Sequence, residues 1–223
     1  MKVNIEPRQP RVPEIGSRLV EAVGLAALCH ADHRRKGTEI PYVGHLLAVC
    51  GLVIHAGGDE DEAIAALLHD VLEDRPECVT PREIEARFGR GVLEIIEGCS
   101  DDLPDDVSGL PDSPKRRDAG NWARRKTRYL SHLRGVEPSV LRVSCADKVD
   151  NARAIVTDLR RHGDALWDRF NAGRKDQLCY YRGLVEVFRE RRHDLGEAGG
   201  WLVDELERQV QEMDRLAYSN ITA

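Results

Sequence analysis

Residues 65–74 read AALLHDVLED, and this stretch decides how the rest of the chain is interpreted. On a helical wheel of about 100° per residue, its polar side chains share one arc of roughly 140° and its apolar side chains lie opposite. Clustered carboxylates repel one another and are costly to remove from water, so a buried face of this kind needs a positive partner. The pattern predicts an amphipathic helix over residues 60–73 whose polar face consists of His69, Asp70, Glu73 and Asp74.

A divalent metal ion is the simplest positive partner for this face. The adjacent His69 and Asp70 offer one nitrogen and one oxygen ligand, a mixture that suits manganese, zinc or iron better than calcium. A solvated acidic helix end is the alternative, because residues 59–62 are acidic as well.

Two other segments each place an isolated polar residue among apolar neighbours, namely His45 and Asp147. With His69 and Asp70 they would form a set of two histidines and two carboxylates, which leaves an octahedral metal with open positions for water and substrate. Each residue alone allows a plainer interpretation. His45 could cap a helix or belong to the core, and Asp147 could pair with an arginine such as Arg153.

The length and charge of the chain limit its class. Its 223 residues suffice for one good core and are few for two independent domains, so we expect a flexible arm at residues 1–12 and one domain at residues 13–223. The net charge of −6 argues against a nucleic-acid partner. No apolar run approaches the ~20 residues that cross a bilayer, so we expect a cytoplasmic protein without a membrane partner. A homo-oligomer is compatible with the sequence.

The six cysteines are spread along the chain, with no Cys-x-x-Cys pair and no apolar signal segment before them. This distribution is typical of small core residues in a reduced cytosol. The cysteines in question are Cys29, Cys50, Cys78, Cys99, Cys145 and Cys179.

The spacing of apolar residues predicts an all-α fold, with no convincing strand and no internal repeat. Glycine and proline mark residues 34–44 as a loop, and residues 100–114, rich in proline and aspartate, as a mobile acidic loop. Thr80-Pro81 with Glu83 is typical of a helix start. The expected helices cover residues 13–33, 45–56, 60–73, 81–88, 90–98, 115–134, 138–163, 174–192 and 197–217.

The chain resembles the HD-domain phosphohydrolases, and among them the alarmone hydrolases of the RelA/SpoT-homologue type. The matching motifs agree in order and spacing over residues 20–160. They are Arg35-Lys36-Gly37, Pro41-Tyr42 with His45, Ala66-Leu67-Leu68-His69-Asp70, Glu73-Asp74, Phe88-Gly89, Ala146-Asp147-Lys148, and Asn151 with Arg153.

The resemblance implies a single-domain helical HD bundle that binds manganese through His45, His69, Asp70 and Asp147. The implied reaction removes the 3′-pyrophosphate from guanosine tetra- or pentaphosphate and returns GDP or GTP. The 223 residues leave no room for the synthetase and regulatory domains of the full-length members, so we expect a stand-alone small alarmone hydrolase.

The resemblance also implies roles for residues around the metal. Glu73 and Asp74 would assist the attacking water as catalytic residues. The small-molecule nucleotide substrate would be bound by Arg35, Lys36, Asn151 and Arg153. The basic segment 115–134 would either contact the phosphates or form a solvated face that balances the acidic loop before it.

Several positions depart from the family pattern, and they keep more than one function open. Leu46 replaces the usual proline after the first ligand histidine, and Asp150 and Ala154 stand where the expected nucleotide pocket carries different residues. A (p)ppApp-type substrate therefore stays open. The sequence is also compatible with a different HD-domain hydrolase, such as a nucleoside monophosphate 5′-nucleotidase, and with a catalytically silent nucleotide sensor.

Overall fold

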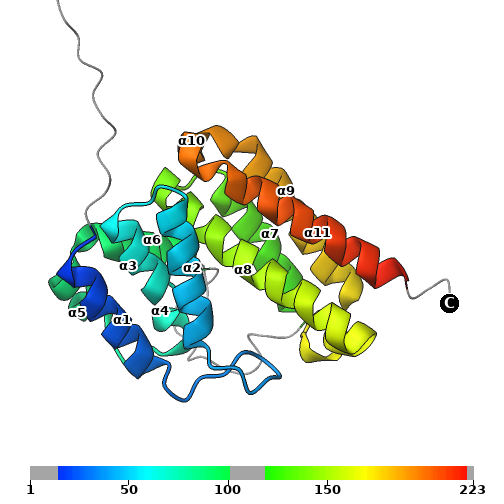
Figure 1. Ribbon diagram of the computed structural model, residues 1–223, viewed down its shortest axis with the longest axis horizontal. Helices are drawn as coiled ribbons and strands as arrows, with labels where there is room; N and C mark the ends of the chain where they lie inside the picture. The colour runs from blue at the N-terminus through cyan, green and yellow to red at the C-terminus, as the bar shows by residue number, and fades with distance from the viewer. Residues whose placement is uncertain (1–14, 101–118, 220–223) are drawn as a thin grey trace, which may run out of the picture.

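The computed structural model describes residues 15–100 and 119–219, and within these ranges the fold is all-α, as the sequence predicts (Figure 1). The described residues form no β-strand, and the β-type pairing found among them is an isolated bridge between Arg34 and Pro41. The predicted N-terminal arm, most of the acidic loop and the start of the basic segment lie outside the described residues. The main helices are α1 (Ser17–Cys29), α2 (Val43–His55), α3 (Glu60–Leu68), α4 (Val71–Asp74), α5 (Pro81–Phe88), α6 (Arg90–Cys99), α7 (Ala119–Leu133), α8 (Pro138–His162), α9 (Arg174–Glu190), α10 (Gly196–Gly199) and α11 (Trp201–Ser219).

The long helix α8 joins two groups of helices (Figure 1). It packs against α2, α3 and α6 on the side of the N-terminal half, and against α11 on the other side. Its buried positions include Val143, Ala146 and Val149, so apolar residues recur at the helical period. Asp147 is buried on the same helix, which places its carboxylate between the two groups.

Local sequence signals account for the starts of α3 and α5. Asp59 and Glu62 form a reciprocal capping box at the start of α3. Thr80 and Glu83 form the same arrangement at α5, with Pro81 in the first turn, so the predicted helix start is confirmed. Gly89 has φ of 94°, a conformation that favours glycine, and it separates α5 from α6 as predicted.

Three predicted boundaries are wrong. The helix expected over residues 60–73 is interrupted, because His69 and Asp70 lie in a turn between α3 and α4. The first helix ends at Cys29 rather than near residue 33. The last predicted helix is divided, since Gly196–Gly199 forms the short α10 before α11 begins. None of the described helices combines the length and the hydropathy that crossing a membrane requires.

The expectation of six reduced core cysteines is also wrong in part. A disulfide joins Cys29, at the end of α1, to Cys78, in the loop that follows α4. Cys50 and Cys145 are buried as expected, whereas Cys179 is exposed. The disulfide was missed because partners 49 residues apart leave no local spacing signal.

Candidate functional site

The loop between α1 and α2 is folded tightly enough to aim Arg35 inward. The Arg35 amide donates to the Ile40 carbonyl at 2.9 Å, and the Thr38 amide donates to the Arg35 carbonyl at 2.9 Å. Gly37 lies at the turn with φ of 71°, and a side chain there would come within 2.7 Å of Arg169. Glycine is therefore required at this position for the conformation and for the close approach.

Three helix ends bring a histidine and carboxylate cluster together. His45 comes from the first turn of α2, and His69 and Asp70 come from the turn between α3 and α4. One ligand atom from each of these three residues lies within 4.8 Å of the others. Asp147 of α8 joins them, since its Oδ1 is 3.3 Å from His45 Nε2 and 3.7 Å from His69 Nε2. All four sequence-predicted ligands therefore meet in one place.

Both histidines point the same ring nitrogen into the cluster. His69 Nδ1 lies 2.8 Å from the Ala66 carbonyl, which only accepts, so Nδ1 carries the hydrogen. His45 Nδ1 lies 2.7 Å from Asp150 Oδ2, which likewise accepts. The two Nε2 atoms are buried and have no hydrogen-bond partner among the residues that the structure describes. Two buried lone pairs facing two carboxylates form a donor set that fits a divalent metal ion.

Asp147 is held as a carboxylate by its neighbours. Lys148 Nζ donates to Oδ2 at 2.6 Å, and Asn151 Nδ2 donates to Oδ1 at 2.5 Å. Burial by itself would raise the pKa of Asp147, but the Lys148 ammonium lowers it well below its usual range. The Lys148 ammonium also lies 5.1 Å from the centre of the Tyr129 ring. This carboxyl group is therefore ionised and ready to act as a ligand.

Asp70 is oriented by the Tyr42 hydroxyl, which donates a hydrogen bond to its Oδ2. The same Oδ2 lies 3.0 Å from His69 Nε2. The Tyr42 ring stacks on His33 with 4.0 Å between ring centroids, and His33 in turn stacks on His30.

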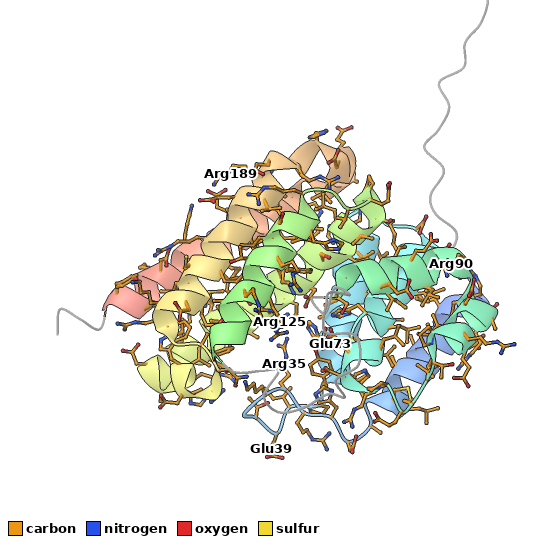
Figure 2. The ribbon with its side chains drawn as sticks, turned by 180° about the vertical axis from the view of Figure 1, so that it is seen from behind. Arg35, Glu39, Glu73, Arg90, Arg125 and Arg189 are labelled. Carbon is orange, nitrogen blue, oxygen red and sulfur yellow. A yellow bond between two sulfur atoms is a disulfide. The ribbon has the colours of Figure 1, made fainter. Side chains whose placement is uncertain are left out.

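Glu73 and Asp74, the predicted catalytic pair, lie in α4 directly after the turn that carries His69 and Asp70, and both are half-buried. The Asp74 amide donates to the Asp70 carbonyl at 2.8 Å, which fixes α4 to that turn. Figure 2 shows Glu73 and Arg35 near the middle of one face, where the N-terminal group of helices meets α7 and α8.

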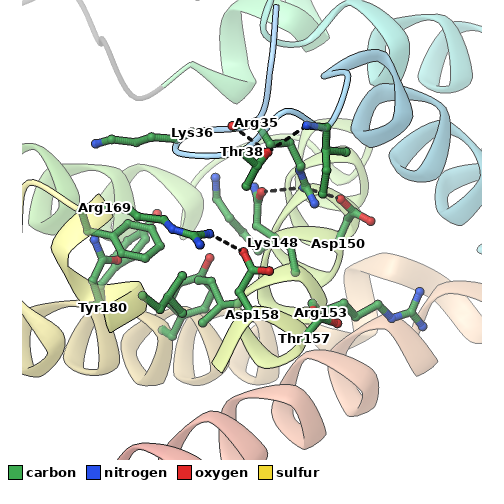
Figure 3. A pocket seen from close by; sticks show the side chains of 18 of the residues that line it. Arg35, Lys36, Thr38, Lys148, Asp150, Arg153, Thr157, Asp158, Arg169 and Tyr180 are labelled. Carbon is green, nitrogen blue, oxygen red and sulfur yellow. Dashed lines mark hydrogen bonds and ion pairs between the residues drawn. The ribbon is translucent and has the colours of Figure 1, made fainter. Parts of the chain in front are cut away.

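A pocket of about 540 Å³ adjoins the cluster (Figure 3). One wall carries the aromatic residues Trp122, Phe170, Tyr180 and Tyr181. The Arg169 guanidinium pairs with Asp158 at 2.9 Å across the pocket lining. The cationic lining residues outnumber the two aspartates and are Arg35, Lys36, Lys126, Lys148, Arg153, Arg161 and Arg169.

The predicted substrate residues all line this pocket, but they do not face it equally. Arg35 reaches Asp150 at 2.7 Å and Asn151 at 3.3 Å, so both residues lie at the end near the cluster. Lys36 donates instead to Asn171 at 3.0 Å. Arg153 is turned toward α11, where its Nε donates to Glu205 at 2.8 Å (Figure 3). Arg153 therefore pairs with Glu205 and not with Asp147.

Sequence reasoning missed other residues of the site. The sequence marks Asp150 only as a departure from the family pattern, although it follows Asp147 by three residues and so shares its helix face. Arg169 lies in the 3₁₀ segment Gly163–Arg169, which has no periodic pattern to indicate an inward side chain. Trp122 also reaches the pocket, and only its size and apolar character could have marked it.

Comparisons with known proteins agree with this geometry. The HD domain family matches residues 22–178. The Xenopus tropicalis protein named guanosine-3′,5′-bis(diphosphate) 3′-pyrophosphohydrolase MESH1 is 36% identical over 152 residues, covering 67% of this chain and 73% of that protein. The Escherichia coli K12 protein named bifunctional (p)ppGpp synthase/hydrolase SpoT is 32% identical over 138 residues, covering 62% of this chain and 18% of that protein.

A solved structure, described as "A metazoan ortholog of SpoT hydrolyzes ppGpp and plays a role in starvation responses", shares the fold. It superposes with a TM-score of 0.64 at 24% sequence identity, covering 89% of this chain and 97% of that one. From the family match and the identity to MESH1, we conclude that this chain belongs to the HD-domain family, among relatives of the MESH1 and SpoT type.

Proposed function

We propose that this protein is a manganese-dependent hydrolase that removes the 3′-pyrophosphate from (p)ppGpp-like nucleotides, giving GDP or GTP and pyrophosphate. The names of its relatives support this reaction. The observation that carries the proposal is the basic pocket that opens beside the histidine and carboxylate cluster. A nucleotide with four or five phosphates needs this density of positive charge next to the reacting bond.

An HD domain implies a divalent metal ion, and we assign its ligands to His45, His69, Asp70 and Asp147. Two imidazole nitrogens and two carboxylate oxygens form a set that suits manganese. When bound, such an ion lowers the pKa of a coordinated water and takes up charge on phosphoryl oxygens.

The remaining polar residues divide into two tasks in this proposal. Arg35 and Lys36 contact the phosphates from the loop, and Asn151 contacts the nucleotide from α8 while holding Asp147. Glu73 accepts the proton of the attacking water, and Asp74 assists it. The aromatic wall of the pocket offers flat surfaces against which a nucleobase can stack.

A hydrolysis panel tests the proposal directly. Purified protein with manganese is offered ppGpp, pppGpp, ppApp and nucleoside monophosphates, and the products are separated by anion exchange. We expect release of pyrophosphate from the 3′ position, and the ratio of rates then gives the preference for guanine or adenine. Phosphate release from the monophosphates alone would show that this is a nucleotidase. No turnover with any divalent metal would favour a nucleotide sensor.

A further inference from the structure

We propose that Asp150 is a positioning residue, which fixes the tautomer and the orientation of His45 and thereby sets the affinity of the cluster for a divalent metal. The inference rests on the metal site of the proposed function and does not depend on the substrate. Asp150 was not among the residues that the sequence marked for the site.

The geometry of this contact is that of a carboxylate supporting a ligand histidine. Asp150 Oδ2 lies 2.7 Å from His45 Nδ1, and His45 Nε2 lies on the cluster side, 3.3 Å from Asp147 Oδ1. The His45 side chain is fully buried and that of Asp150 is 15% exposed, so water competes little for this hydrogen bond. A hydrogen held on Nδ1 leaves the Nε2 lone pair free for a metal ion.

The two ligand histidines obtain this support in different ways. His69 follows α3, and the carbonyl of Ala66 in the last turn of that helix accepts its Nδ1 hydrogen. His45 lies in the first turn of α2, and the acceptor that its Nδ1 meets among the described residues is the carboxylate of Asp150 on α8. Asp150 follows Asp147 by three residues, so one face of α8 supplies both a ligand and the support for a second ligand.

The Arg35 guanidinium offsets the negative charge that Asp150 adds beside the cluster. Its Nη2 lies 2.7 Å from the same Asp150 Oδ2 that accepts from His45. The guanidinium offsets the charge that a further carboxylate would bring to a cluster that already holds Asp70 and Asp147. The same oxygen therefore joins a metal-site histidine to an arginine of the pocket. Figure 3 shows Arg35 and Asp150 side by side.

Manganese titration of the purified chain without substrate tests the inference. We expect Asp150→Ala to weaken manganese binding by about 10–100-fold, as loss of a partner behind a ligand histidine does elsewhere. Asp150→Asn keeps an acceptor of the same shape and loses the charge, so its loss should be smaller. Asp204→Asn, which removes an exposed carboxylate paired with Arg192, is the matched control and should bind manganese like the unchanged chain.

A second readout reports on the histidine itself. Nitrogen-15 NMR of histidine side chains in the metal-free protein shows which ring nitrogen carries the hydrogen. We expect His45 to be protonated on Nδ1 in the unchanged chain and to lose this preference in Asp150→Ala. Unchanged manganese affinity together with an unchanged tautomer would overturn the inference.

Discussion

The hydroxyl of Tyr42 donates a hydrogen bond to Asp70 Oδ2, so a residue just before α2 holds a carboxylate of the turn between α3 and α4. Burial raises the pKa of Tyr42 far above its ordinary value, and the charge of Asp70 raises it further. The hydroxyl therefore stays protonated at neutral pH and remains a donor to Asp70.

Tyr42→Phe should reduce manganese affinity by about tenfold or more, because the ligand carboxylate loses the donor that orients it. The ring stack on His33 is retained, so the fold should be preserved. Isothermal titration with manganese measures the change, and Tyr218→Phe, at an exposed position on α11, is the control. An unchanged dissociation constant for Tyr42→Phe would show that the Tyr42 contact does not orient a ligand.

Asp147→Asn should lose metal binding and turnover together, because the buried carboxylate is both a ligand and the partner of Lys148. Asp147→Ala should in addition lower the free energy of unfolding by about 3–5 kcal/mol, since it leaves the buried Lys148 charge unpaired. Metal content of the purified variants and urea unfolding measure the two effects. Normal turnover by Asp147→Asn would mean that the proposed ligand set is wrong.

Glu73→Gln should bind manganese normally and turn over the substrate about 10²–10⁴-fold more slowly, as expected for loss of a general base. Glu73 follows the ligand turn on α4 and is not one of the clustered ligands. Manganese titration and steady-state kinetics on the same preparation separate the two effects. A parallel loss of metal would instead assign Glu73 to the ligand set.

The helical fold and the candidate ligands His45, His69, Asp70 and Asp147 could be predicted from the sequence because both leave local patterns. Apolar periodicity marks helices such as α8, and an isolated polar residue such as Asp147 is conspicuous within one. The break at His69 and Asp70 escaped prediction because helical propensity continues across it. The turn is set by the packing of α3 and α4 around the cluster, which is a tertiary effect.

The residues that escaped prediction are those defined by contacts between distant segments. Asp150 acquires its place from His45 and Arg35, which lie more than one hundred positions earlier in the chain. Arg169 approaches Gly37 because a 3₁₀ segment packs on the loop before α2. Neither contact leaves a spacing signal in a single sequence.

The free energy of unfolding should depend on pH partly through the titration of His30. Burial lowers its pKa to about 4, and the neighbouring His33 contributes in the same direction. Between pH 6.5 and pH 4, His30 is therefore protonated in the unfolded chain and neutral in the folded protein. Its contribution to the free energy of unfolding is fully present above about pH 6.5 and is lost as the pH falls toward 4. Linkage gives a loss of about 2 kcal/mol between pH 7 and pH 5.

Urea unfolding at these two pH values tests this expectation by comparison of variants. His30→Gln removes the titrating group, so the difference in unfolding free energy between pH 7 and pH 5 should shrink relative to the unchanged chain. His162→Gln, at an exposed histidine in the last turn of α8, should leave the difference as it is. Equal pH dependence in His30→Gln and the unchanged chain would exclude His30 as its source.

The disulfide between Cys29 and Cys78 ties the end of α1 to the loop after α4, and its removal should destabilise the protein. Partners 49 residues apart close a large loop in the unfolded chain, and a loop of this size corresponds to a loss of up to about 4 kcal/mol when the bond is broken. Urea unfolding of Cys78→Ser against Cys179→Ser, whose thiol is exposed and unpaired, measures this contribution. Reductant should lower the stability of the unchanged chain toward that of Cys78→Ser and leave Cys78→Ser itself unaffected. If all six thiols of the unfolded, unreduced protein could be alkylated, the disulfide would be absent. Packing alone would then hold the end of α1 in place.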